Sequence, residues 1–381
     1  MQIPSCKHFT GYKPCFPGTT CEKVCERPLP IGTRILLINL DALGNVLATT
    51  SILPAIKRRY PESHITWITL KNAAPLLQNN PLLDRVFLWD AESRMIIEAE
   101  EFDLVLNVDK SPRSGAFAQR VKAKEKLGFG INRDGVIIPL NPEAEENYML
   151  GLDDHLKFRV NQKTVPQLQC EEFRLPYARD KYILNLGPDE ERYCEGYKEE
   201  HGISSAELVV GLNTGCSDLY PNKKLTVDQH IGLIERLRKA GGMTLVLLGG
   251  PEDTLRNAEI ARWAGRTVIN TPTTEGVRRG ICYENICDLI ITGDSFGMHV
   301  GIALGKYVVA WFGLSCWTEI DLFDHGRKFI PEGLECSPCC KRTCPYNLEC
   351  ISMVDLDGIV DEVLKYRTRW KRATIGAETR Q

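Results

Sequence analysis

The stretch Ile290–Gly313, IITGDSFGMHVGIALGKYVVAWFG, decides how the rest of the chain is interpreted. The apolar run Asp288–Thr292 predicts a buried parallel strand that stops where a turn begins at Gly293. A helix is predicted to follow this turn and to end at Gly305, and Tyr307–Phe312 predicts the next strand. A strand, a loop, a helix and a second strand in this order are typical of a parallel α/β sheet.

The loop between this first strand and its helix is predicted to bind a phosphate. It lies at the carboxyl end of a strand and the amino end of a helix, where free backbone N–H groups and the helix dipole favour an anion. Asp294 or Ser295 can cap the helix, and Asp294 and His299 are available for sugar hydroxyls. These features indicate a nucleotide-sugar site. The alternative is a plain crossover in which Asp294 only caps the helix and His299 is packed.

Length and composition predict a soluble globular protein of about two domains, because 381 residues with 43% hydrophobic and 25% charged residues can bury a large core. A net charge of −3 gives no reason to expect a nucleic acid partner. The chain contains no run of about 18 apolar residues, and its beginning is polar and rich in cysteine, so we expect neither a transmembrane helix nor a signal peptide. We therefore expect a cytoplasmic protein with at most peripheral contact with the inner membrane.

Fifteen cysteines cluster mainly at the two ends of the chain. In the cytoplasm, clustered cysteines are more often metal ligands than disulfides. The first group, Cys6, Cys15, Cys21 and Cys25, lies in a segment with several glycines and prolines and no helical or strand period. A bound metal would order this segment, either within a site of its own or together with the second group.

The second group lies in ECSPCCKRTCPYNLEC, residues 335–350. Two cysteines separated by two residues let one tight turn offer two thiolates to one ion. Adjacent cysteines rarely both reach one ion, so we expect Cys340 to be the spare and the ligands to be Cys336, Cys339, Cys344 and Cys350. Zn²⁺, a single iron and an iron–sulfur cluster all fit four thiolates. We expect a structural role, distant from the phosphate-binding loop.

Between the two cysteine groups the chain alternates strands and helices in two halves. The first half opens with the strand Arg34–Leu40, the loop Asp41–Gly44 and a helix from Asn45 to about Tyr60. Four further short strands are predicted in this half: Ile65–Leu70, Val86–Leu88, Leu104–Asn107 and Lys126–Phe129. After the mixed, charged stretch Tyr177–Ser205, the second half repeats the pattern with the strand Leu208–Asn213, the helix Thr226–Ala240 and the strand Thr244–Leu248.

This alternation predicts an α/β protein with two Rossmann-like, doubly wound domains facing each other across a cleft, and cysteine-rich terminal segments. We expect four parts: a cysteine-rich segment, residues 1–33; a first domain, residues 34–180; a second domain, residues 205–350, that includes the cysteine-rich loop 336–350; and residues 351–381, whose helix Asp355–Arg369 is expected to return to the first domain.

Several motifs, taken in order, resemble glycosyltransferase family 9, the lipopolysaccharide heptosyltransferases of the GT-B fold. They are LDALGNVLATTSILPAIKRRYP (40–61), GLNTG (211–215), PNKKLT (221–226), LLGGPED (247–253) and TGDSFGMHVGIALGKYVVAWFG (292–313). The resemblance extends from Arg34 to the C-terminal helix. ECSPC with the later cysteines also resembles the tail of many members, whereas the N-terminal cysteine segment is found in only part of the family. Related autotransporter-modifying heptosyltransferases hold iron with four cysteines.

The resemblance implies an inverting transferase whose catalysis needs no metal. The donor, usually ADP-heptose, would bind in the second half, and the acceptor, a lipopolysaccharide core, another cell-surface glycan, a lipid-linked glycan or a protein, in the first. It assigns Thr214 and Gly215 to the phosphate loop, Lys223 or Lys224 to the phosphate and Glu252 to the ribose. The loop over the donor sugar and diphosphate would comprise Asp294, Ser295, Phe296, Gly297 and His299. For the two lysines and Glu252 the alternative is a solvated loop charge.

One position departs from the family. Where the family has an aspartate taken as the catalytic base, this chain has Asn45, and an amide accepts no proton at neutral pH. Three interpretations remain open: Asp41 supplies the base, Asn45 is a substitution that traps substrate, or the protein binds without turnover. We place the last two ahead of Asp41, which starts from the strand end instead of the helix start. The second function class is thus a sugar-nucleotide or partner-binding protein whose cysteines serve assembly or redox sensing.

Overall fold

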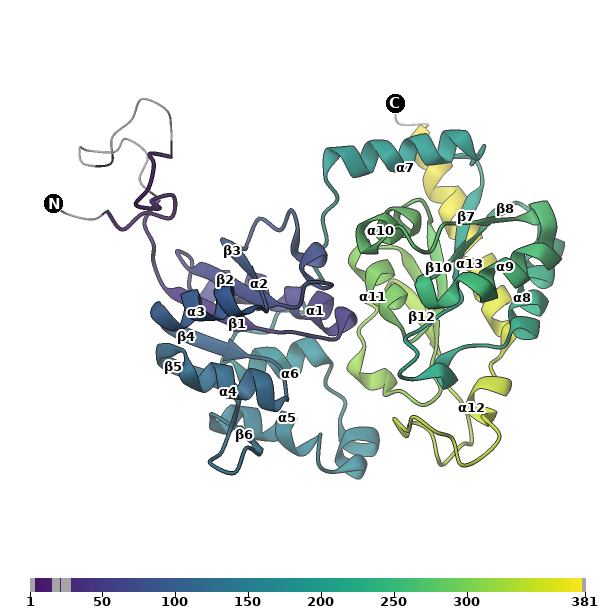
Figure 1. Cartoon of the computed structure of the whole chain (residues 1–381). Coiled ribbons are helices and arrows are strands. Elements are labelled where there is room, and N and C mark those ends of the chain that lie inside the picture. The colour runs from purple at the N-terminus through teal and green to yellow at the C-terminus, as the bar shows by residue number, and fades with distance from the viewer. Residues whose placement is uncertain (1–3, 16–20, 22–28, 379–381) are drawn as a thin grey trace. The chain divides into compact units, whose positions relative to one another are not determined.

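The computed structural model describes residues 4–15, 21 and 29–378. The chain forms two compact units, which are coloured by residue number in Figure 1. Unit 1 comprises Met1–Leu152 and Pro166–Asp180, and unit 2 comprises Asp153–Val165 and Lys181–Gln381. Each unit has its own sheet and its own apolar core.

Unit 1 is built on a six-stranded sheet of order β3-β2-β1-β4-β5-β6. Its strands are β1 (Arg34–Ile38), β2 (His64–Thr69), β3 (Arg85–Leu88), β4 (Glu101–Asn107), β5 (Lys122–Ile131) and β6 (Ile137–Pro139). Its α-helices are α1 (Leu43–Thr49), α2 (Leu53–Arg59), α3 (Ala91–Ala99), α4 (Pro112–Arg120), α5 (Glu145–Met149) and α6 (Val165–Glu172). The strand pairs are parallel except for β5 with β6.

Unit 2 is built on a second six-stranded sheet, of order β12-β11-β10-β7-β8-β9, and all its strand pairs are parallel. Its strands are β7 (Leu208–Asn213), β8 (Met243–Leu248), β9 (Val268–Asn270), β10 (Leu289–Gly293), β11 (Tyr307–Trp311) and β12 (Gly326–Phe329). Its α-helices are α7 (Pro188–Glu200), α8 (Val227–Ala240), α9 (Thr254–Ala264), α10 (Val277–Asn285), α11 (Phe296–Ala303), α12 (Glu349–Ser352) and α13 (Leu356–Glu378).

The two sheets have the same strand order. When the strands are renumbered within each unit, both orders become 3-2-1-4-5-6, which is the classic order of a doubly wound sheet. The strand order therefore reverses between β1 and β4 in unit 1, and between β7 and β10 in unit 2. Ligands of such sheets bind at the carboxyl ends of the two strands that flank this switch point. The fold class predicted from the sequence, two doubly wound domains, is confirmed.

Buried strands and capped helices explain why these segments fold as they do. Every residue of β7 and of β10 is buried, as expected for parallel strands covered on both faces by helices. The start of α8 carries a capping box: Thr226 Oγ1 accepts from the Gln229 backbone N–H at 3.1 Å, and the Gln229 side chain accepts from the Thr226 N–H at 2.9 Å. The predicted helix start at Thr226 is therefore correct.

The C-terminal helix packs within unit 2, which corrects the expectation that it returns to the first domain. In α13, Ile359 and Val363 are fully buried in the apolar core that also contains residues of α8 and β11. The sequence showed an apolar helix face but not which core would bury it. Residues 153–165 also belong to unit 2: Lys157 lies 3.3 Å from Glu319, and Arg159 donates to the Ser337 carbonyl at 3.1 Å.

Helix α7 lies inside the stretch Tyr177–Ser205 that the sequence showed only as mixed and charged. Cys194 and Tyr197 are its only buried side chains. An apolar stripe this narrow gives little helical periodicity, so the sequence signal was too weak to find the helix.

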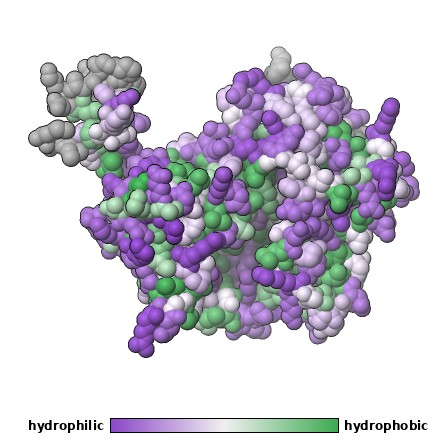
Figure 2. Space-filling view, in the orientation of Figure 1, coloured by the Kyte–Doolittle hydropathy of each residue, from purple (hydrophilic) through white to green (hydrophobic). Residues whose placement is uncertain are grey.

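The described part of the N-terminal segment is attached to unit 1 through Lys7. Cys6 forms an isolated antiparallel bridge with Pro30, and Lys7 Nζ lies 2.7 Å from Asp84 Oδ1 and 3.0 Å from the Ser63 carbonyl. Among the described residues, no helix is long and apolar enough to cross a membrane. On the face drawn in Figure 2, exposed apolar residues are scattered among hydrophilic ones.

Candidate active site

The switch point of unit 2 brings two of the predicted donor loops together through one side chain. Asn213, the last residue of β7, donates from Nδ2 to Ser295 Oγ at 2.8 Å and to Thr292 Oγ1 at 3.0 Å. Asn213 is buried, so these bonds connect the loop after β7 with the loop after β10 inside the protein. The sequence analysis did not identify Asn213, because only the pairing of β7 with β10 places its amide beside Ser295.

The start of α11 has no side-chain cap among the described residues. Ser295 occupies the N-cap position but its side chain caps no N–H group, which corrects the expectation that it or Asp294 caps the helix. The first N–H groups of α11 are thus left without a side-chain cap among the described residues. Gly297 must be a glycine, because a Cβ there would lie 2.7 Å from Asn213 Nδ2. The neighbouring Phe296 is half-buried.

Lys223 and Asp294 form a close ion pair at this site, with 2.7 Å between Nζ and Oδ2. Burial alone would raise the pKa of the Asp294 carboxyl, but the charges of Lys223 and His299 hold this pKa below its usual value. Trp311 Nε1 donates to the Lys223 carbonyl at 3.1 Å and fixes the backbone that carries the lysine. One of the two predicted lysines therefore lies directly beside the predicted carboxylate.

His299 is packed in the interior next to this pair. Its ring stacks on Tyr182 with 6.0 Å between ring centroids and an interplanar angle of 23°. Burial lowers the pKa of His299 to about 4, so the imidazole is neutral at neutral pH. Its buried Nδ1 has no hydrogen-bond partner among the described residues.

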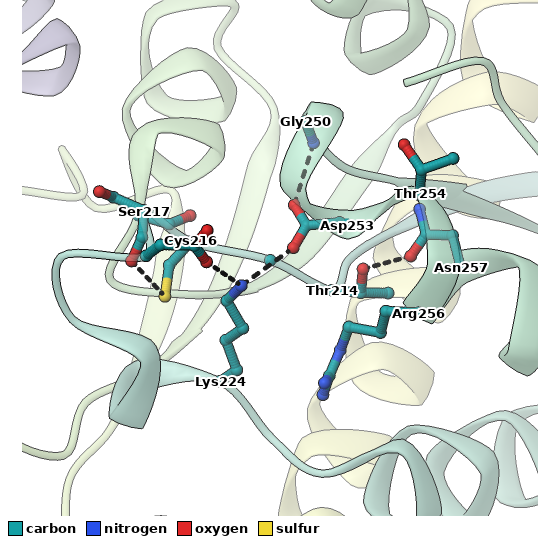
Figure 3. Close-up of polar contacts among 12 residues, drawn as sticks. Thr214, Cys216, Ser217, Lys224, Gly250, Asp253, Thr254, Arg256 and Asn257 are labelled. Carbon is teal, nitrogen blue, oxygen red and sulfur yellow. Dashed lines mark hydrogen bonds and ion pairs between the residues drawn. The ribbon is translucent and has the colours of Figure 1, made fainter. Parts of the chain in front are cut away.

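Lys224 forms an ion pair with a second aspartate, Asp253, which follows β8. Its Nζ lies 3.2 Å from Asp253 Oδ1 and 3.4 Å from Asp218 Oδ1 (Figure 3). Burial works against the charged ammonium, but attraction to Asp253 raises the pKa of Lys224 above its usual value. Asp253 is itself almost fully buried, and its Oδ2 accepts from the Gly250 N–H at 3.0 Å. Lys224 therefore remains a cation at the carboxyl ends of β7 and β8.

The predicted phosphate loop packs tightly against the same aspartate. A Cβ on Gly215 would lie 1.7 Å from Asp253 Oδ2, so no side chain fits there. The Thr214 hydroxyl is buried and hydrogen-bonds Asn257, as drawn in Figure 3, and the Thr214 backbone N–H donates to the Leu248 carbonyl at 3.2 Å. Glu252, the predicted ribose ligand, is exposed. The sequence analysis missed Asp253 because a buried and an exposed carboxylate look alike in sequence.

The switch point of unit 1 carries carboxylates at the ends of β1 and β4. Asn45 is exposed in α1 and has no carboxylate to offer. Asp41 is half exposed, and its Oδ2 lies 2.5 Å from Arg113 Nη2. Asp109 is buried and accepts from the Leu40 N–H and from Asn39 Nδ2, both at 2.6 Å. Burial raises the pKa of Asp109 to about 7 against these hydrogen bonds.

Four C-terminal cysteines line one pocket of about 260 Å³: Cys336, Cys339, Cys344 and Cys350. Cys340 is absent from the lining, and burial raises the pKa of its thiol to about 11 against the charge of Lys157. Burial, followed by the neighbouring thiols of Cys339, Cys344 and Cys336, raises the pKa of Cys350 to about 11. All four predicted metal ligands of the C-terminal group therefore line one pocket.

By type, four thiols that line one pocket suit a thiophilic metal. No group of three or more His, Cys, Asp or Glu in the described part of the chain is placed to hold a metal. No such group is formed by Cys6, Cys15 and Cys21 at the other end of the described chain either, and Cys25 lies outside the described residues.

Comparison with known proteins places these observations in a family context. A scan against models of known protein families finds no match. The chain is 28% identical to the lipooligosaccharide heptosyltransferase 2 of Campylobacter jejuni, over 86% of this chain and 96% of that protein. It is also 23% identical to the lipopolysaccharide core heptosyltransferase OpsX of Haemophilus influenzae, over 73% of this chain and 78% of that protein.

Solved structures show the same fold. The E. coli ADP-heptose lipopolysaccharide heptosyltransferase II has a TM-score of 0.64 at 18% identity and covers 89% of this chain and 100% of its own. A glycosyl transferase family 9 protein from Veillonella parvula has a TM-score of 0.63 at 19% identity, over 78% of this chain and 85% of its own. TibC of E. coli, an iron-containing heptosyltransferase, has a TM-score of 0.51 at 11% identity, over 89% and 79%. The fold is therefore GT-B.

Proposed function

We propose that this protein, which is similar to the heptosyltransferases of glycosyltransferase family 9 in sequence and in fold, moves a heptose from ADP-heptose to an acceptor glycan. The acceptor is the lipopolysaccharide core or another cell-surface, lipid-linked or protein-bound acceptor. The observation that carries the proposal is the switch point of unit 2, where Asn213 connects the loops after β7 and β10 and two lysines form ion pairs nearby.

Unit 2 would bind the donor. The negative charge on the leaving nucleotide diphosphate grows in the transition state. The uncapped N–H groups at the start of α11, together with Lys223 and Lys224, would stabilise this charge. Two ammonium groups supply this stabilisation, so the reaction needs no metal for catalysis. Asp294 and the unpartnered nitrogen of His299 would bind sugar hydroxyls, and the exposed Glu252 would bind the ribose.

Unit 1 would bind the acceptor and supply the base. An inverting transfer is one displacement: the acceptor oxygen forms the new bond to the sugar carbon, the bond to the diphosphate breaks, and a carboxylate takes the hydroxyl proton. Asn45 takes no proton, which leaves Asp41 as the carboxylate at the end of β1. Arg113 orients Asp41 through their 2.5 Å ion pair. Asp109 holds the Leu40 backbone from which Asp41 extends.

Donor binding is tested first, by calorimetry with ADP, ADP-heptose and the corresponding UDP and GDP compounds. We expect ADP and ADP-heptose to bind best. Lys224→Ala and Lys223→Ala should each weaken ADP binding by about 10- to 100-fold, the effect of losing a charged hydrogen bond. Lys239→Ala, which removes an exposed lysine of the same unit, is the matched control and should change nothing. Equal affinity of all four proteins for ADP would refute this donor site.

A second candidate function is supported by Asn45: a protein that binds the nucleotide sugar without transferring it. The two functions differ in one measurement, transfer of heptose by the natural sequence. Tight donor binding with no transfer to any acceptor supports the binding protein, whereas measurable transfer that depends on Asp41 supports the enzyme.

We also infer a structural metal, Zn²⁺ or iron, alone or in an iron–sulfur cluster. Cys336, Cys339, Cys344 and Cys350 would hold it, because four thiolates suit these ions and all four residues line one pocket. Elemental analysis of anaerobically purified protein and its visible absorption separate zinc from iron. Removing the metal, or Cys339→Ser, should lower the melting temperature, while Cys340→Ser should not. A second set of metal ligands, made of Cys6, Cys15, Cys21 and Cys25, stays a proposal.

A further inference from the structure

The cysteine loop, residues 336–350, touches the lysine loop, residues 217–224, which carries both proposed donor lysines. Asn222 lies immediately before Lys223 and lines the same pocket as the four cysteines. Its Nδ2 donates to the Lys341 carbonyl of the cysteine loop at 3.1 Å. Thus one residue of the lysine loop lines the thiol pocket and is hydrogen-bonded to Lys341, which lines the same pocket.

A second contact connects the same two loops through Tyr220. The Arg342 guanidinium lies 5.9 Å from the centroid of the Tyr220 ring, within the range of a cation–π contact. The Lys223 ammonium lies 5.4 Å from the same ring. A movement of the cysteine loop would therefore be transmitted to Lys223 in two ways: through Asn222, which precedes Lys223 in the chain, and through the Tyr220 ring, which Lys223 contacts.

Both loops are also fixed to the end of β11. Trp311, the last residue of the strand, donates to the Lys223 carbonyl at 3.1 Å. Three residues further along, the Leu314 carbonyl accepts from the backbone N–H groups of Cys339 and Cys340 at 2.9 and 2.8 Å. Between them, a Cβ on Gly313 would lie 3.1 Å from Cys350 Sγ. The cysteine loop is therefore adjacent to the lysine loop.

We propose that the occupant of the thiol pocket, a thiophilic cation, controls the affinity of the neighbouring donor site through these contacts. That the affected ligand is a nucleoside diphosphate rests on the proposed function. The coupling itself rests only on the contacts of Asn222, Tyr220 and Leu314.

The physical reason is the entropy of ordering the lysine loop. A cation that draws four thiolates together fixes the backbone of residues 336–350, and with it the Lys341 carbonyl and the Arg342 side chain. Asn222 and Tyr220 are then held, so Lys223 and Lys224 lose less freedom when a diphosphate binds. A coupling of ordinary size changes affinity by about 5- to 150-fold.

The experiment uses the full chain, reduced and treated with a chelator, then loaded with Zn²⁺ alone. ADP affinity is measured by calorimetry with and without Zn²⁺, and Zn²⁺ affinity with and without ADP. We expect Zn²⁺ to tighten ADP binding by about fivefold or more, and ADP to tighten Zn²⁺ binding by the same factor, since coupling is reciprocal. Backbone hydrogen exchange of residues 217–224, measured without ADP, should slow when Zn²⁺ binds.

Two asparagine variants separate coupling from folding. Asn222→Ala should bind Zn²⁺ nearly as well as the natural protein but lose most of the effect of Zn²⁺ on ADP affinity. Asn347→Ala is the matched control, because its side chain bonds Glu349 within the cysteine loop, and it should keep the full coupling.

Three outcomes would overturn the proposal: no Zn²⁺ binding, unchanged ADP affinity with Zn²⁺ bound, or unchanged exchange of residues 217–224. A protein that shows the exchange effect but binds ADP in neither form would keep the coupling and refute the proposed donor instead.

Discussion

Asp41 lies in the loop after β1 and Asn45 in the first turn of α1, and the chemistry of these two side chains decides whether the protein turns over. With Asp41 as the base, Asp41→Asn should lower the transfer rate by a factor on the order of 10² or more, with little effect on ADP-heptose affinity. Asn45→Asp should raise the natural rate by a factor on the order of 10², because it restores a carboxylate at the helix start. Single-turnover transfer of heptose measures both.

The double variant Asn45→Asp, Asp41→Asn is the control for these two changes. It should transfer as fast as Asn45→Asp alone if the restored carboxylate replaces Asp41. Natural activity that survives Asp41→Asn would exclude Asp41 as the base.

Asp109 makes stability depend on pH in a defined direction. Its folded pKa of about 7 lies above the unfolded value of about 3.9, so the folded state binds more protons between these values. Its contribution is therefore complete at low pH and is lost as pH rises from about 4 to about 7, by at most on the order of 4 kcal/mol. Asp109→Asn should remove this part of the pH dependence.

Urea unfolding of unit 1 between pH 4.5 and 8 measures the effect. Asp134→Asn is the control, since Asp134 is exposed and its replacement should leave the slope of stability against pH unchanged. If the natural protein and the Asp109→Asn variant show the same slope of stability against pH, folding does not raise the pKa of the Asp109 carboxyl.

At the scale of the element, the loop after β7 is built around a glycine that touches a buried carboxylate. Gly215→Ala places a methyl group 1.7 Å from Asp253 Oδ2, and Asp253 has little room to move because it also holds Lys224 and the Gly250 N–H. We expect a loss of about 1–3 kcal/mol of stability in unit 2 and weaker ADP binding, measured by thermal unfolding and calorimetry.

Gly196→Ala is the matched control within the same unit. Gly196 is exposed in α7, and nothing lies within 4 Å of the position that an alanine methyl group would take there, so alanine should stabilise the helix by about 0.5–1 kcal/mol. If Gly215→Ala and Gly196→Ala have the same melting temperature, the contact between Gly215 and Asp253 does not exclude a side chain at position 215.

At the scale of the whole molecule, the two units have separate cores, so a core substitution should act on one of them. Ile359→Ala in α13 empties a fully buried site in unit 2 and should cost that unit about 2–5 kcal/mol. Hydrogen exchange in β7 and β10 should rise, while exchange in β1 and β4 should not. Leu255→Ala, at a site 86% exposed in the same unit, should change neither. Equal destabilisation of β1 and β4 by Ile359→Ala would contradict separate cores.

The sequence by itself determined the elements and the loops that follow them. Apolar runs and the glycines after strands act between near neighbours in the chain, so the strands β7, β8, β10 and β11 were predicted within one or two residues. Because parallel strands place their carboxyl ends at one edge of a sheet, the predicted loops at Thr214 and Asp294 could also be assigned to one region.

Only the tertiary structure decided which side chains meet. Lys223 pairs with Asp294 across 71 positions of sequence, and Lys224 with Asp253 across 29. Such pairs depend on strand order and register, which neighbouring residues do not encode. The same holds for the burial of Asp109 and for the core that accepts α13. A carboxylate or an apolar face has the same sequence signature whatever packs against it, and its partner is fixed by the folded chain.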